Sequence, residues 1–239
     1  MNLQLTVAPR VAFFGGSFDP PHLGHLAVAR AAKEALGLDT VLFAPVGAQP
    51  LKPLGSTASF ADRLAMTRLA IASEAGFAVS LADAPNPSGK PNYTLETLLR
   101  LRAELPAGGT LFCLMGADSF AGLRRWHRAT EIPFVAPLIV ASRPGQHLDD
   151  LKLALPAGLS IESVPGLDGA EIEVRAYRLC NQTGDSTPFY LLPSLEIEIS
   201  ASEIREQVRI RELVGAAVGD QALLPSAVSG YIHAHGLYG

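Results

Sequence analysis

Short runs of β-branched, aromatic and other apolar residues recur along the first part of the chain, and segments of helical periodicity separate them. Each run has the length of a β-strand, so the pattern predicts a series of buried strands. The predicted strands are Val11–Phe14, Thr40–Val46, Phe77–Leu81, Thr110–Met115 and Pro137–Ala141.

Two helices are predicted between these strands. Leu23–Leu36 is rich in alanine and ends before Gly37, a residue type favoured just after a helix C-terminus. Thr94–Leu105 carries leucines at helical spacing with charged residues between them. This alternation of strands and helices predicts an α/β fold, a Rossmann-like, doubly wound and mostly parallel sheet with helices on both faces. Ligands of such sheets bind beyond the carboxyl ends of the strands.

The pattern weakens over residues 144–194, where prolines and glycines interrupt it. We expect this stretch to be an irregular, insertion-like segment with a strand or two, such as Leu159–Val164, and without a core of its own. The chain as a whole, residues 1–239, is therefore expected to form a single domain.

Regular patterning returns near the C-terminus. Leu195–Ile199 alternates apolar and acidic residues and is predicted to be a strand. A helix is expected from Ser200, and a last helix near Pro225–His235.

The composition indicates which partners and which cell compartment to expect. With 48% hydrophobic and 18% charged residues the chain has the balance of a globular protein, and its net charge of -4 predicts no nucleic-acid partner. Cys113 and Cys180 lie far apart, which favours neither a disulfide framework nor a cysteine-rich zinc site and fits a reducing compartment. The N-terminus does not resemble a signal peptide, and no run approaches the ~18 apolar residues of a membrane span. A cytoplasmic protein without membrane contact is expected.

The first predicted strand runs into the motif GGSFDPPHLGHL. Gly15 and Gly16 permit a tight turn and close approach of a ligand, and the helix that follows directs free N–H groups toward that place. His22 and His25 are three residues apart and face the same side of the helix, with Gly24 leaving room between them. The pattern favours a phosphate site. The alternatives are a capped loop with surface histidines, or a zinc site, for which neither HEXXH nor a third ligand is present.

A second motif, ISASEIR, begins the helix expected from Ser200. Ser200 and Glu203 form an S-x-x-E capping box, which alone accounts for both residues. Ser202 and Arg205 share one face beside the positive end of the helix, where a hydroxyl and a guanidinium could bind phosphate oxygens together. GxGxxG after the first strand and GxxxxGK[ST] are both absent, so a dinucleotide-type or P-loop site is not predicted.

These motifs carry a resemblance to a known family. GGSFDPPHLGHL resembles the signature of the nucleotidylyltransferase superfamily with its HxGH element, and ISASEIR is similar to that superfamily's ISSTxIR element. Other segments resemble in order the landmarks of bacterial nicotinate-mononucleotide adenylyltransferases, over nearly the whole chain. These segments are Asn92–Leu98, Met115–Phe120 followed by Leu123 and Trp126, Ala141–Gly145, Leu224–Pro225 and Tyr231–Tyr238.

The resemblance implies three groups of site residues. His22, His25, Lys52 and Arg205 are implied to be catalytic. The residues implied to bind ATP are Gly15, Gly16, Ser17, Phe18, His22, Gly24, His25, Arg143, Ser200, Ser202 and Arg205. The residues implied to bind the mononucleotide are Tyr93, Thr94, Asp118 and Trp126, with Trp126 stacked on the pyridine ring.

The sequence departs from the family pattern in two of its motifs, and residues 144–194 are longer than usual for the family. Ala201 and Ser202 stand at the second and third hydroxyl positions of ISSTxIR, so one hydroxyl is lost. The loop after the second strand reads Gln-Pro-Leu-Lys at 49–52 where the family has Pro-Pro-His-Lys, which keeps Lys52 and loses the histidine.

The activity implied by the resemblance is transfer of AMP from ATP to the 5′-phosphate of nicotinate mononucleotide in NAD biosynthesis, giving deamido-NAD and pyrophosphate. The implied cofactor is Mg²⁺, held mainly by the ATP phosphates. The alternatives are an enzyme for nicotinamide mononucleotide or for both mononucleotides, and a non-catalytic nucleotide-binding module. A homo-oligomer remains open.

Overall fold

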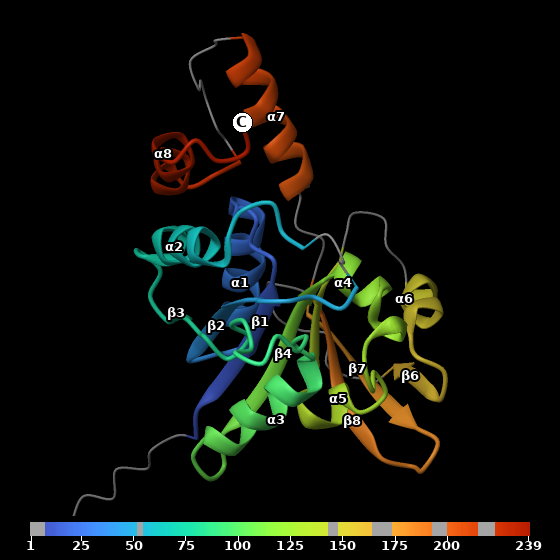
Figure 1. The fold of residues 1–239 in the computed structure, drawn as a ribbon. Coiled ribbons are helices and arrows are strands. Elements are labelled where there is room, and N and C mark those ends of the chain that lie inside the picture. Colours follow the sequence, from blue (N-terminus) through green and yellow to red (C-terminus); the bar gives the residue numbers. More distant parts are fainter. Residues whose placement is uncertain (1–7, 52–54, 143–147, 164–173, 193–199, 215–222) are drawn as a thin grey trace, which may run out of the picture.

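The computed structural model describes residues 8–51, 55–142, 148–163, 174–192, 200–214 and 223–239. An eight-stranded sheet with the order β3-β2-β1-β4-β5-β8-β7-β6 forms its centre (Figure 1). The strands are β1 (Arg10–Gly16), β2 (Thr40–Pro45), β3 (Phe77–Val79), β4 (Thr110–Gly116), β5 (Leu138–Ala141), β6 (Leu159–Ser163), β7 (Arg175–Asn181) and β8 (Ser186–Leu192).

Helices cover both faces of the sheet, as a doubly wound fold requires. The α-helices are α1 (Leu23–Leu36), α2 (Phe60–Ile71), α3 (Thr94–Glu104), α4 (Ala117–Ala121), α5 (Ile132–Val135), α6 (Leu148–Ala154), α7 (Ala201–Val214) and α8 (Ser226–Ala234), and Leu123–Arg125 is a 3₁₀ turn, η1. No helix in the described ranges is both long enough and apolar enough to cross a membrane.

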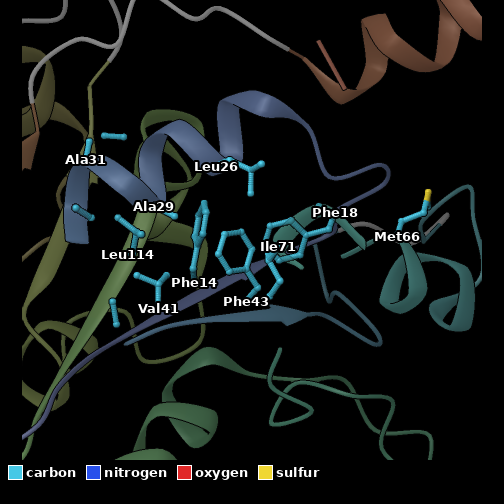
Figure 2. Packing of buried hydrophobic residues seen from close by; sticks show 14 of the residues in the cluster. Phe14, Phe18, Leu26, Ala29, Ala31, Val41, Phe43, Met66, Ile71 and Leu114 are labelled. Atoms are coloured by element: carbon cyan, nitrogen blue, oxygen red, sulfur yellow. The ribbon is translucent and has the colours of Figure 1, made fainter. Parts of the chain in front are cut away.

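The side chains of β1 show how the two cores are divided. Ala12 and Phe14 point into a cluster with α1, α2, α7 and α8, whereas Val11 and Phe13 point into a cluster with α3, α4, α5 and α6. Figure 2 shows the first cluster, in which Phe14 packs near Phe43 and beneath α1. Because β1 is buried on both faces, its sequence is a continuous apolar run without alternation.

The five strands predicted in the first part of the chain are present, and α1 has the predicted bounds. Six strands that are consecutive in the sheet, β3, β2, β1, β4, β5 and β8, pair in parallel. This parallel arrangement confirms the predicted fold class. The strand expected at 195–199 lies outside the described residues.

The stretch at 144–194 is more regular than expected. It contains α6 and three strands, and β8 pairs in parallel with β5 through the Ile139–Tyr190 register. β7 and β6 then extend the sheet in antiparallel order. The stretch therefore adds to the same sheet, and Tyr177, Leu179 and Phe189 pack into the second core cluster. That residues 1–239 form a single domain stays a prediction.

Candidate active site at the carboxyl ends of the strands

A cavity of about 1140 Å³ opens at the carboxyl ends of β1 and β4. The N-termini of α1, α3, α4 and α7 border it. Lys52 and Arg143 lie outside the described residues, and all other predicted site residues line this cavity. These residues are Gly15, Gly16, Ser17, Phe18, His22, Gly24, His25, Tyr93, Thr94, Asp118, Trp126, Ser200, Ser202 and Arg205.

The glycines at the end of β1 have aromatic rings directly beside them. A Cβ atom on Gly15 would lie 2.8 Å from the ring of Phe13, and one on Gly16 would lie 3.1 Å from the ring of Phe18. Phe18 itself is buried, with its ring against Phe14 and His25. Phe18 therefore occupies a core position in which its ring packs against His25, and its contact with ATP stays a prediction.

The two histidines lie together at the start of α1. His22 is the N-cap residue, and its backbone N–H donates to Nδ1 of His25 over 3.1 Å. The ring centroids are 3.7 Å apart with 31° between the ring planes. Because Nδ1 of His25 accepts this hydrogen bond, the proton of the neutral ring is assigned to Nε2.

Both imidazoles favour the neutral form. Burial lowers the pKa of His22 from 6.5 to about 4. Burial, and in second place the charge of His22, lowers the pKa of His25 well below its ordinary value. In the structure, His25 is thus a neutral Nε2–H donor beside a cavity, and Nδ1 of His22 is buried without a hydrogen-bond partner.

We expect the free energy of unfolding to fall as the pH is lowered from about 6.5 to 4. In this range the unfolded chain binds a proton at His22 that the folded protein does not, because the folded pKa is the lower one. At about 1.4 kcal/mol per pKa unit, His22 accounts for about 3 kcal/mol of this loss. Denaturant titrations at several pH values measure it. The variant H22Q should show a smaller pH dependence, and H233Q, at an exposed histidine of α8, should show that of the wild type.

The second motif reaches the first across the cavity. Arg205 donates from Nη1 to the backbone carbonyl of Asp19 at 2.6 Å and from Nη2 to the hydroxyl of Ser202 at 3.0 Å. The carbonyl of Ser200 accepts from the N–H of Ile204 at 3.1 Å, as expected of the N-cap of α7. The structure thus brings the two motifs together at one cavity, as far as the described residues show.

Aromatic and basic side chains from η1 and the start of α3 also line the cavity. Trp126 follows η1, and Arg125 and His127 on either side of it also line the cavity. The ring of His127 lies 4.5 Å from that of Tyr93, and its Nε2 is 3.6 Å from a carboxylate oxygen of Glu96. The other carboxylate oxygen of Glu96, Oε2, is buried without a hydrogen-bond partner.

Residues that the motifs do not contain complete the site. Arg63 of α2 is buried and donates to the carbonyls of Ser17 and Val46 at 2.6 and 2.8 Å. Asp83, also buried, lines the cavity and accepts from the hydroxyl of Thr97 at 2.6 Å. Burial raises the pKa of Asp83. Sequence reasoning missed these residues, because Arg63 stands beside Asp62 in a mixed stretch and Asp83 stands in a loop rich in proline and polar residues.

Among the residues that the structure describes, the cavity has no metal site made by protein side chains alone. Within the residues that the structure describes, no group of three or more His, Cys, Asp or Glu side chains could hold a metal ion. Any Mg²⁺ that accompanies ATP would therefore need phosphate oxygens and water for most of its ligands, an arrangement common for this ion.

Comparison with known proteins identifies the family. Residues 13–207 match the model of the family described as cytidylyltransferase-like. A protein of Gloeobacter violaceus named "Probable nicotinate-nucleotide adenylyltransferase" is 38% identical over 96% of both chains. The chain belongs to the nicotinate-nucleotide adenylyltransferase family. A protein of the same name from Laribacter hongkongensis is 39% identical, with 98% of this chain and 97% of that protein covered.

Solved structures agree on the fold of this family member. A Plasmodium falciparum nicotinic acid mononucleotide adenylyltransferase complexed with NaAD matches with a TM-score of 0.64 at 16% identity, covering 96% of this chain and 97% of that one. The same enzyme complexed with APC gives a TM-score of 0.65 at 14% identity. At such low identity the likeness supports the Rossmann-like fold alone.

Proposed function

We propose that the protein transfers AMP from ATP to the 5′-phosphate of nicotinate mononucleotide. An oxygen of that phosphate bonds to the α-phosphorus of ATP, the bond from this phosphorus to the bridging oxygen breaks, and pyrophosphate leaves with that oxygen. The products are deamido-NAD and pyrophosphate. The observation that carries the proposal is the hydrogen bond between Arg205 and Asp19, which brings both phosphate-binding motifs to one cavity. The names of the relatives and of the bound neighbour support the acceptor.

The reaction needs no nucleophile–base pair from the protein. The attacking phosphate oxygen is anionic at neutral pH and pyrophosphate is a good leaving group, so catalysis consists of positioning and neutralising charge. His25 donates from Nε2 to an oxygen of the α-phosphate, with His22 toward the β-phosphate. Gly15, Gly16 and Gly24 let the triphosphate approach the backbone.

Arg205 and Ser202 bind the triphosphate from the opposite side of the cavity. Lys52 and Arg143, which lie outside the described residues, are assigned to the developing charge and to ATP by resemblance alone. Ser17 and Phe18 belong to the loop that holds ATP, and Ser200 to the N-terminus of α7. When bound, Mg²⁺ would neutralise part of the charge on the phosphates.

The acceptor lies toward Trp126, whose indole stacks on the pyridine ring, and Asp118 lies near a ribose or a phosphate-bound metal ion. α3 begins at Thr94, and Tyr93 at its N-cap makes no side-chain capping hydrogen bond. The first N–H groups of a helix lack intrahelical partners and form a positive end. This helix end therefore suits the carboxylate of the nicotinate ring. A cytoplasmic location and a homo-oligomer stay predictions.

The assay is release of pyrophosphate and deamido-NAD from ATP, Mg²⁺ and nicotinate mononucleotide. The wild type should form both products in equal amounts. Arg205→Ala should lower kcat/KM for ATP by roughly 10- to 100-fold, because it removes charge-assisted hydrogen bonds to the triphosphate. Ser200→Ala, at the same helix end, should chiefly cost about 1 kcal/mol of stability as a lost cap. Equal effects of both variants on ATP use would contradict the assignment of Arg205.

A further inference from the structure

Asp19 connects segments that lie far apart in the sequence. Its carboxylate is buried and accepts the N–H groups of Thr57 at 2.6 Å and Ala58 at 3.0 Å. It also accepts the hydroxyl of Tyr238 at 2.8 Å, from the second-last residue of the chain. The backbone carbonyl of Asp19 accepts from Arg205. One residue therefore joins the ATP loop, the segment before α2, the end of the chain and α7.

The surroundings of Asp19 are fixed by Arg63. Its guanidinium donates to the carbonyls of Ser17, Val46 and Ala58, so three segments around Asp19 are held by one buried side chain. The carboxylate oxygens of Asp19 have limited freedom to rotate in this setting, and each of them has a donor. The contacts that orient this carboxylate therefore determine whether it can pair with the guanidinium of Arg205.

The carboxylate of Asp19 could compete with ATP phosphates for the guanidinium of Arg205. Its Nη1 bonds to the backbone carbonyl of Asp19 but is also 4.0 Å from the carboxylate oxygen Oδ2. If the carboxylate turned toward Arg205, it would pair with the guanidinium and occupy N–H groups that a phosphate needs. The hydrogen bond from Tyr238 to Oδ1 opposes this rotation, together with the backbone N–H groups of Thr57 and Ala58.

We propose that the hydroxyl of Tyr238 is a positioning group for Arg205, acting through Asp19. The inference rests on the proposed function, in which Arg205 binds the triphosphate. Burial, followed by the charge of Asp19, raises the pKa of Tyr238 above its ordinary value, so the phenol stays protonated and remains a donor. The end of the chain thus takes part in ATP binding without touching ATP.

The test compares Tyr238→Phe with Tyr231→Phe. Tyr231, on α8, donates its hydroxyl to the carboxylate of Asp62 at 3.0 Å, so both variants remove one tyrosine-to-aspartate hydrogen bond from the C-terminal segment. α8 packs beside α2 (Figure 1), and neither Tyr231 nor Asp62 lines the cavity. Tyr238→Phe should lower kcat/KM for ATP by about tenfold, because a misplaced binding group weakens catalysis. Tyr231→Phe should stay within about twofold of the wild type while losing similar thermal stability.

Two further measurements separate the positioning role from a general loss of stability. Calorimetry with ATP and Mg²⁺ alone should show weaker binding for Tyr238→Phe than for Tyr231→Phe. In an Arg205→Ala background, Tyr238→Phe should have no additional effect on ATP binding. Equal ATP binding by the two tyrosine variants, or full additivity with Arg205→Ala, would overturn the inference. If the wild type binds ATP but makes no deamido-NAD, the proposed function fails, and weaker ATP binding by Tyr238→Phe still supports the positioning role.

Discussion

Replacing His25 by alanine is expected to lower the turnover of ATP and nicotinate mononucleotide by roughly 10²–10³, the usual cost of removing a preorganised donor to a transition state. Burial lowers the pKa of the His25 ring and favours its neutral form, its Nδ1 accepts the N–H of His22, and its Nε2–H is left to donate. Phe14 and Phe18 pack against the ring and hold its orientation. A donor that is fixed before the reaction needs no rearrangement when charge develops on the phosphate.

Asparagine at position 25 separates the two roles of this histidine. Its side-chain oxygen can accept the N–H of His22 at the start of α1, but its amide is too short to replace Nε2–H. His25→Asn should therefore be more stable than His25→Ala by about 1 kcal/mol, with equally low turnover. Pyrophosphate release and thermal unfolding, measured on both variants, test this. Either variant, if folded and near wild-type turnover, would show that His25 is structural only.

The first part of the fold could be predicted because its signals are local. α1 begins and ends where the sequence places it, and Gly37 after its end has a φ of 55°, the left-handed conformation that favours glycine. β1, β2 and β4 are buried on both faces and appear in the sequence as unbroken apolar runs. Such elements need no knowledge of their neighbours in space.

Elements whose buried positions are polar or interrupted were harder to predict. α2 buries Arg63 and Thr67 beside Met66, so its inner face does not look apolar. β7 has exposed arginines, and Pro188 interrupts the pattern of β8. These two strands could not be predicted from their own sequences, because their place in the sheet depends on pairing with other strands, as β8 pairs with β5.

The candidate site divides in the same way. His22, His25, Ser202 and Arg205 stand in two compact motifs, and the cavity brings these motifs together as expected. The residues that hold these motifs in place contact segments far away in the sequence. Asp19, for example, accepts a hydrogen bond from a tyrosine 219 residues away. No spacing rule in the sequence could indicate that contact.

The enzyme is expected to prefer nicotinate mononucleotide to nicotinamide mononucleotide by roughly a hundredfold or more. The first N–H groups of α3, at Thr94 and the residues after it, would meet both oxygens of a carboxylate. With the amide, a helix N–H would face the NH₂ group, and each such contact in a buried site costs about 1–3 kcal/mol. Glu96 is near but pairs with His127, and Arg125 beside Trp126 adds positive charge.

Comparing kcat/KM for the two mononucleotides, each with ATP and Mg²⁺, measures this preference. Arg125→Gln should reduce it by about three- to tenfold, because a cation near the ring carboxylate is lost. Arg124→Gln is the matched control: Arg124 is also exposed on η1 but does not line the cavity, so the same charge is removed without effect on the ratio. Equal kcat/KM values in the wild type would indicate a dual-specificity enzyme. Preference for the amide would overturn the assignment of the acceptor but not that of the ATP site. If neither mononucleotide led to release of pyrophosphate, another acceptor phosphate or a nucleotide-binding module would be favoured.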